Sequence, residues 1–253
     1  MVRQKNVFIT GASSGIGQAC AELFAKAGAS LIIAARRKER LESLAHELSL
    51  KYSVSVRPIV LDVQKYEQVD NTICALKAAG DSIDILINNA GLALSIDRIQ
   101  NADVGNWDTM IDTNIKGLLY VTRAVLPHMC ERNSGHIINI GSIAGHECYP
   151  GGNIYSATKH AVRAISKSLR MDLLGYNIRV TEIDPGAVHT EFSEVRLKDK
   201  EKADKVYQGY QPLLAHDIAD AALYAATRLP HVNVSEIVVH PQAQAAVTQV
   251  FRK

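Results

Sequence analysis

Cysteine is scarce in this chain of 253 residues, and no two cysteines lie close enough in sequence to form a metal-binding or redox pair. The four are spread along the chain, at Cys20, Cys74, Cys130 and Cys148. Isolated cysteines of this kind are typical of free thiols in a reducing compartment. The HExxH spacing of a zinc site is also missing around His146, His160 and His189. We therefore expect neither a disulfide framework nor a metal centre.

An excess of one charge and long hydrophobic runs are missing as well. Lysine and arginine number 28 and aspartate and glutamate 26, so the net charge is only +2. This balance argues against nucleic acids and anionic membranes as partners. No apolar run approaches the roughly 18 residues that span a bilayer. The opening MVRQKNVFIT has too short an apolar stretch for a signal peptide, so we expect a cytoplasmic protein.

What the chain does have is a regular alternation of short apolar runs and longer amphipathic stretches. The runs expected to form strands are 6–10, 30–35, 54–61, 83–88, 136–141, 179–183 and 234–240. Most are continuously apolar, as strands are when helices cover both faces of a parallel sheet. Because no linker or repeat is visible, residues 1–253 are expected to form one α/β domain. We expect it to be doubly wound, with a mostly seven-stranded parallel sheet and helices on both faces.

One polar segment interrupts this alternation late in the chain. Residues 187–211 include the charged stretch TEFSEVRLKDKEKADKVYQ, between the last two expected strands. Long connections in compact domains are often functional, so we expect a substrate lid here. A solvated amphipathic helix without a special role is the alternative interpretation.

The first expected strand leads into a glycine-rich turn, GASSGIG, and then into a helix. Gly11, Gly15 and Gly17 permit a tight turn and a close approach to a pyrophosphate, while the N–H groups at the helix start attract phosphate. Ser13 and Ile16 belong to the same turn. The order of strand, turn and helix favours a dinucleotide site in a Rossmann-type domain over an ordinary strand-to-helix turn.

The spacing TGxxxGIG resembles the short-chain dehydrogenase/reductase family and differs from the GxGxxG of long-chain dehydrogenases. The end of the second expected strand, LIIAARRKER, bears on the cofactor. Ala35 stands where an acidic residue would bind the ribose 2′-hydroxyl of NAD, and Arg36 and Arg37 suit the 2′-phosphate of NADP. Ser13 adds a hydroxyl donor. The sequence therefore favours NADP(H), with a surface arginine pair as the alternative.

Further matches to the family follow the later strands, and the resemblance now covers nearly the whole chain. It implies contacts to adenine, to the ribose and nicotinamide region, and to the nicotinamide carboxamide. The matching residues are, in that order, Asp62 and Val63; Asn89, Ala90 and Gly91 of an NNAG motif; and Pro185, Gly186 and Thr190 of a PGxxxT motif.

A serine, a tyrosine and a lysine stand close together in GSIAGHECYPGGNIYSATK. Tyr155 and Lys159 are four apart at the start of an expected helix, and Ser142 follows a strand end, where ligands of parallel sheets bind. We expect Tyr155 to exchange a proton with the substrate oxygen and Ser142 to hold that oxygen. Lys159 and the positive charge of oxidised nicotinamide are together expected to lower the tyrosine pKa. By resemblance, Lys159 also bonds the nicotinamide ribose, and Asn114 holds a water in a proton relay. An exposed helix face and a helix-interior asparagine are the alternatives.

Three segments resemble one subgroup of the family, the NADP-dependent 3-hydroxy acid dehydrogenases: YPGGNIYSATK, PGAVHTEFSEVR and VNVSEIVVHPQAQ. The resemblance implies serine, allo-threonine, 3-hydroxypropionate or related semialdehydes as substrates. A small anion requires a cation, and Arg196 in the expected lid is the candidate for its carboxylate or sulfonate. Tyr149 and Asn153 are candidate pocket residues. A solvated arginine and two ordinary loop residues are the alternatives.

Other functions stay open at this point. One is a broad NADPH-dependent reductase of neutral carbonyls or of sulfoacetaldehyde. Another is an NADPH-binding sensor or scaffold, although such proteins commonly lose members of the catalytic set. A sugar-nucleotide epimerase would need a longer chain. The family resemblance also implies a homotetramer, packed through the helices around Asn114 and Tyr155.

Overall fold

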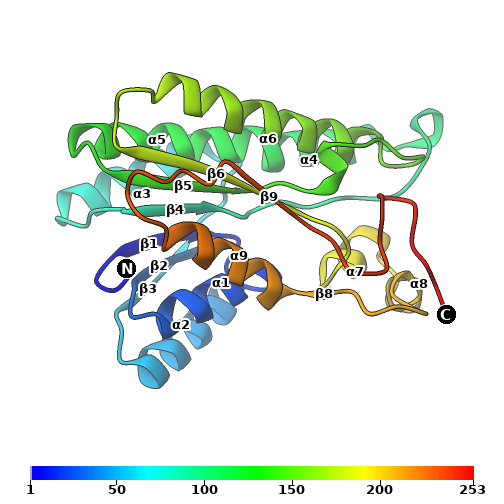
Figure 1. The fold of residues 1–253 in the computed structure, drawn as a ribbon, viewed down its shortest axis with the longest axis horizontal. Helices are drawn as coiled ribbons and strands as arrows, with labels where there is room; N and C mark the ends of the chain where they lie inside the picture. The colour runs from blue at the N-terminus through cyan, green and yellow to red at the C-terminus, as the bar shows by residue number, and fades with distance from the viewer. Residues whose placement is uncertain (1) are drawn as a thin grey trace.

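Residues 2–253 are described by a computed structural model, in which seven parallel strands form one sheet (Figure 1). The strands lie in the order β3-β2-β1-β4-β5-β6-β9. Their bounds are β1 (Asn6–Thr10), β2 (Ser30–Ala35), β3 (Val56–Val60), β4 (Ile85–Asn88), β5 (Gly135–Ile140), β6 (Ile178–Pro185) and β9 (Glu236–Val239). The seven expected strands are confirmed, with ends that differ by at most two residues.

Helices cover both faces of this sheet (Figure 1). One face carries α1 (Gly15–Lys26), α2 (Lys38–Tyr52) and α9 (Ala215–Ala226); the other carries α3 (Tyr66–Ala78), α4 (Val104–Ile111), α5 (Leu118–Glu131) and α6 (Asn153–Asp172). Successive side chains of a strand point to opposite faces, so each strand contributes side chains to the hydrophobic core on each face of the sheet. Val7 and Ile9 pack with α1 and α9, whereas Phe8 packs with α3 and α5. The expected doubly wound architecture is confirmed.

Three short helical turns complete this part of the fold. They are the 3-10 turns η1 (Ile99–Asn101) and η3 (Ile143–Gly145) and the π-helical turn η2 (Asp112–Gly117). The π turn joins α4 to α5 and contains Asn114. Such turns often occur at functional sites. Among residues 2–253, no helix combines the length and apolarity needed to cross a membrane.

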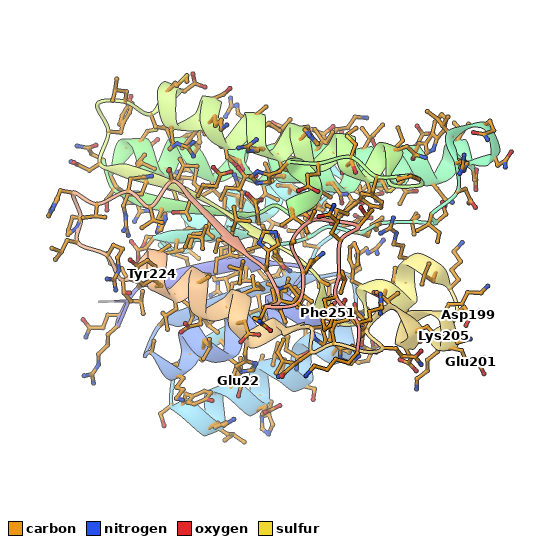
Figure 2. All side chains as sticks on the ribbon, turned by 45° about the vertical axis from the view of Figure 1, so that its right-hand side comes forward. Glu22, Asp199, Glu201, Lys205, Tyr224 and Phe251 are labelled. Carbon is orange, nitrogen blue, oxygen red and sulfur yellow. The ribbon has the colours of Figure 1, made fainter. Side chains whose placement is uncertain are left out.

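The polar segment after β6 folds into short elements. They are β7 (Val188–His189), α7 (Phe192–Leu197), α8 (Lys200–Val206) and β8 (Leu213–Leu214), and the two strands pair with each other in parallel. The sequence did not predict these strands, because two residues leave no apolar run. Figure 2 shows charged side chains at the outer edge of α8, among them Asp199, Glu201 and Lys205. Near the C-terminus, the Arg252 guanidinium donates to the backbone oxygen of Val206.

Candidate active site

A cavity of about 370 Å³ opens where β1, β2, β3, β4, β5 and β6 end. This is the carboxyl edge of the sheet, where doubly wound folds bind their ligands. Every cofactor residue predicted from the sequence lines the cavity except Gly17. Ser142, Tyr155 and Lys159 line it as well. The structure therefore brings together residues from turns spread over most of the chain.

The glycine turn at the start of α1 leaves no room for a side chain at Gly11 or Gly17. Gly11 has φ +67°, and a Cβ there would lie 2.9 Å from the Ala90 Cα. A Cβ on Gly17 would overlap the Asn89 amide and lie 2.5 Å from the Gly11 oxygen. The Asn89 amide donates to the backbone oxygens of Thr10 (3.0 Å) and Gly11 (3.2 Å), which fixes the turn. Gly17 thus acts by letting α1 pack against the turn.

The N-terminus of α1 faces this cavity with its first N–H groups available. The N-cap residue, Ser14, makes no side-chain cap hydrogen bond, and Gly15 and Ile16 of the first turn line the cavity. Uncapped N–H groups and the positive end of the helix dipole suit a phosphate. The residues present therefore fit the pyrophosphate of a dinucleotide.

Two of the arginines after β2, Arg37 and Arg40, belong to a hydrogen-bonded cluster. Arg37 donates from Nε to Ser13 Oγ (3.0 Å) and from Nη2 to Ser14 Oγ (2.6 Å). Its Nη1 donates to Glu191 Oε2 (2.9 Å), and Arg40 donates to Glu191 Oε1 (2.6 Å). These bonds, from Arg40 and then Arg37, lower the pKa of Glu191. Glu191 thus ties Arg37, predicted to bind the 2′-phosphate, to Arg40, and sequence reasoning missed both Glu191 and Arg40.

Tyr155 and Lys159 lie one turn apart on α6, with the lysine Nζ 5.9 Å from the centre of the tyrosine ring. Lys159 is buried and donates to the Ile140 oxygen at 2.9 Å. Burial lowers its pKa to about 8, and burial raises the pKa of Tyr155 to about 12, against a hydrogen bond with Ser142. In the protein alone, loss of water around the phenolate outweighs the nearby charges. The lowered tyrosine pKa that we expect with oxidised nicotinamide bound stays a prediction.

Asn114 lies behind this pair and ties the turn after β4 to α6. Its Oδ1 accepts from the Leu92 N–H (2.9 Å), and its Nδ2 donates to the Leu92 oxygen (2.8 Å) and to Thr158 Oγ1 (3.0 Å). A Cβ on Gly91 would lie 3.3 Å from Asn114 Oδ1 and 3.8 Å from Lys159 Nζ. The Asn114 side chain therefore braces the wall beside the lysine, and the water relay stays a prediction.

A buried acid, Asp184, holds the serine in place, and sequence reasoning missed it. Its Oδ1 accepts a hydrogen bond from the Ser142 N–H (2.9 Å), and its Oδ2 lies 2.8 Å from His146 Nε2. His146 Nε2 also lies 3.4 Å from Glu236, to which Arg163 donates at 3.0 Å. In residues 2–253 His146, Asp184 and Glu236 are the one group spaced to hold a metal ion. Arg163 already supplies positive charge there, so we interpret the group as an ion-pair network.

Arg196 of α7 lies over the tyrosine. Its guanidinium carbon is 5.7 Å from the Tyr155 ring centre and 5.4 Å from that of Tyr149. One turn earlier on α7, the Phe192 ring lies 5.6 Å from Tyr155. Arg196 Nε donates to the Ser95 oxygen (3.1 Å), whereas its buried Nη2 has no hydrogen-bond partner among the described residues. An arginine with a spare buried donor thus stands beside the tyrosine.

The other predicted pocket residue, Asn153, is occupied elsewhere. Its Nδ2 donates to the Asp97 oxygen at 2.9 Å, and its Oδ1 accepts from the Ile154 N–H at 2.6 Å. Asn153 therefore braces the chain around Asp97 at the start of α6. Tyr149, Asn153 and Arg196 all lie outside the lining of the 370 Å³ cavity. Arg196 adjoins it through Tyr155, and Tyr149 lies against Arg196.

Comparison with known proteins places this site in a family. A family model described as short chain dehydrogenase matches residues 5–201. The NADP-dependent 3-hydroxy acid dehydrogenase of Schizosaccharomyces pombe is 45% identical over 251 residues, which cover 98% of this chain and 97% of that protein. Sulfoacetaldehyde reductase 2 of Chromohalobacter salexigens is 47% identical over 241 residues, covering 94% of this chain and 95% of that protein.

A solved structure agrees with these matches. The closed form of a serine dehydrogenase complexed with NADP+ matches with a TM-score of 0.92 at 44% identity, covering 98% of this chain and 99% of that one. The family model, the relatives and the fold point the same way, and the cavity collects the motif residues that carried the resemblance. This chain belongs to the short-chain dehydrogenase family.

Proposed function

We propose that this chain is an NADP(H)-dependent oxidoreductase acting on small 3-hydroxy acids and the matching semialdehydes. Hydride would move between nicotinamide and the β-carbon of substrates such as serine, allo-threonine or 3-hydroxypropionate. The observation that carries the proposal is the position of the Arg196 guanidinium, 5.7 Å from the ring of Tyr155. It supports a site for the substrate anion beside the tyrosine that would exchange the proton.

The cofactor end of the site suits a dinucleotide with a 2′-phosphate. Arg36 and Arg37 provide positive charge at the end of β2, and Ser13 stands within hydrogen-bond reach of Arg37. Ala35, the last residue of β2, stands where a carboxylate would repel the phosphate. The relative from Schizosaccharomyces pombe and the matched serine dehydrogenase structure are both described with NADP, which supports the same choice.

The reaction needs one proton transfer in each direction. In reduction Tyr155 would give its proton to the carbonyl oxygen, and in oxidation it would take that proton back, while Ser142 holds the oxygen. When bound, nicotinamide would supply the hydride in reduction and accept it in oxidation, and its positive charge in the oxidised form would lower the tyrosine pKa from about 12. Lys159, one helical turn away, would hold the cofactor ribose and keep charge near the phenol.

The substrate anion would bind the free donor of Arg196. A buried donor without a partner costs about 1–3 kcal/mol, so a carboxylate or sulfonate that accepts from Nη2 would offset that cost. The guanidinium fork also suits a planar carboxylate. Because Arg196 is on α7, we propose that residues 187–211 act as the substrate lid, with Phe192 and Arg196 covering Tyr155.

The main competing function is reduction of neutral carbonyls, with sulfoacetaldehyde as an anionic variant. The relative named sulfoacetaldehyde reductase 2 favours keeping sulfonates among the candidate substrates. Kinetics with serine, 3-hydroxypropionate, sulfoacetaldehyde and propanal, each with both cofactors, separate the alternatives. We expect NADP-linked activity on serine and 3-hydroxypropionate, and activity confined to propanal or sulfoacetaldehyde would contradict the proposal.

A substitution of Arg196 tests the anion site directly. Arg196→Gln removes the charge, and we expect KM for 3-hydroxypropionate to rise at least about tenfold while kcat/KM for propanal stays within about threefold. Lys202→Gln is the matched control, because Lys202 is an exposed cation on α8 of the same segment. An equal loss on both substrates in Arg196→Gln would show that the arginine only stabilises the fold.

We also propose a cytoplasmic homotetramer. The outer layer of α5 and α6 carries exposed apolar side chains, including Leu119 and Met171, of the kind that subunit interfaces cover. The four free cysteines suit a reducing compartment. Sedimentation equilibrium would test the assembly, and a monomeric mass at micromolar concentration would contradict it.

A further inference from the structure

We infer that Glu191 is a cofactor-specificity residue, whose carboxylate competes with the 2′-phosphate of NADP(H) for Arg37 and Arg40. This inference rests on the proposed use of NADP(H). It goes beyond the presence of arginines after β2, because it assigns an opposing role to an acid that is distant in sequence. Glu191 would weaken the binding of NADP(H) while leaving NAD(H) largely unaffected.

The carboxylate of Glu191 is hydrogen-bonded to both Arg37 and Arg40. Glu191 Oε2 accepts from Arg37 Nη1 at 2.9 Å, and Oε1 accepts from Arg40 Nη1 at 2.6 Å. Both carboxylate oxygens are therefore occupied by guanidinium donors. Arg37 donates its other groups to Ser13 and Ser14, so its guanidinium is held on three sides. Glu191 lines the same cavity as Arg36 and Arg37.

The position of Glu191 is set by its neighbours in the chain. Thr190 lies against the glycine turn, where a Cβ on Gly15 would stand 3.4 Å from it, and its Oγ1 accepts from the Phe192 N–H at 3.2 Å. Phe192 in turn packs against Tyr155, with ring centres 5.6 Å apart. Glu191 is thus fixed between two residues that contact the cofactor turn and the catalytic tyrosine.

The charges of these side chains determine whether Glu191 strengthens or weakens the binding of NADP(H). Arg37 and Arg40 carry two positive charges, and Glu191 neutralises one of them. A 2′-phosphate that reaches Arg37 must either displace the carboxylate, which breaks charge-assisted hydrogen bonds, or lie close to it and be repelled. A 2′-hydroxyl carries no charge and faces neither cost. The side chains are roughly half exposed, so solvent screens the effect and we expect it to be moderate.

The experiment measures cofactor binding without turnover. Isothermal titration calorimetry with NADPH, NADH, 2′,5′-ADP and 5′-AMP gives Kd for the wild-type enzyme, for Glu191→Gln and for Glu194→Gln. Glu194 is the matched control, because it is an exposed acid in α7 and no described ion pair joins it to an arginine. The adenosine phosphates isolate the 2′ position from the nicotinamide.

We expect Glu191→Gln to bind NADPH and 2′,5′-ADP about tenfold more tightly at low salt, with the gain shrinking in 0.5 M NaCl. Binding of NADH and 5′-AMP should change less than about twofold, and Glu194→Gln should match the wild type. Unchanged or weaker NADPH binding in Glu191→Gln, or an equal gain for NADH, would overturn the inference. A wild-type enzyme that binds NADH as tightly as NADPH would instead contradict the proposed cofactor.

Discussion

The carboxylate of Asp184 anchors the backbone of Ser142, through a hydrogen bond of 2.9 Å from the serine N–H to Oδ1. The second carboxylate oxygen lies 2.8 Å from His146 Nε2, and Asp184 is fully buried. The two bonds close the turn between β5 and η3 against the end of β6. The hydroxyl that is proposed to hold the substrate oxygen is therefore positioned by a side chain 42 residues away in sequence.

This relationship predicts different outcomes for two substitutions. Asp184→Ala leaves the Ser142 N–H without its acceptor and leaves His146 with Glu236 alone, so we expect a loss of about 2 kcal/mol in unfolding free energy and at least a tenfold fall in kcat. Asp184→Asn keeps an acceptor of the same shape and should retain more of both. Urea unfolding and steady-state kinetics check this. If Asp184→Ala kept wild-type kcat, the positioning role would be wrong.

The buried lysine predicts a pH-dependent stability. Burial lowers the pKa of Lys159 from 10.5 to about 8, although the carboxylates of Asp184 and Glu182 oppose the shift. Below pH 8 the lysine is charged in both the folded and unfolded states, and the burial cost opposes folding in full. Between pH 8 and about 10.4 the folded protein has released the proton and the unfolded chain has not, so this cost declines as pH rises.

Lys159→Met removes the cost at every pH. We expect this variant to gain stability relative to the wild type most at pH 7, with the difference smaller by about 2 kcal/mol at pH 9.5. Urea unfolding at both pH values measures it, and Lys167→Met, which deletes an exposed lysine of α6, serves as the control. A difference that stays constant or grows with pH would contradict the account. Catalysis by Lys159→Met should be lost at both pH values.

The contact between Gly17 and the phosphate turn predicts a steric penalty. In Gly17→Ala the new Cβ would lie 2.5 Å from the Gly11 oxygen, so α1 must shift. We expect a loss of about 1–3 kcal/mol in unfolding free energy and at least tenfold weaker NADPH binding. Gly105→Ala is the control, since its Cβ meets the nearest atom at 3.4 Å, within a helix that alanine favours. Equal behaviour of the two variants would refute the close approach.

The sheet could be predicted because its strands are buried on both faces and therefore appear as apolar runs. The limits of this signal are visible at particular residues. Strand β6 extends to Pro185 and includes Glu182 and Asp184, two acids that interrupt the apolar pattern. Strands β7 and β8 are two residues long and exist only because the chain brings them together. The local pattern of apolar residues therefore predicts neither the extended end of β6 nor the strands β7 and β8.

The candidate site likewise has a part that the sequence predicts and a part that it does not. The glycine turn and the pair Tyr155 and Lys159 are local motifs, so their spacing in sequence indicates their arrangement. The role of Glu191 depends on Arg37, 154 residues away, and no spacing rule connects them. The raised pKa of Tyr155 depends on how much water the folded chain removes from the phenol. Burial and long-range pairing are properties of the fold.

The most direct test of the account is the turnover of Tyr155→Phe with NADP+ and 3-hydroxypropionate, measured alongside the Kd for NADPH. The substitution removes only the hydroxyl and keeps the ring that packs against Phe192. We predict that kcat falls by about a hundredfold to ten thousandfold while Kd changes less than about threefold. A kcat within tenfold of the wild-type value, with cofactor still bound, would contradict the central claim that this phenol exchanges the proton.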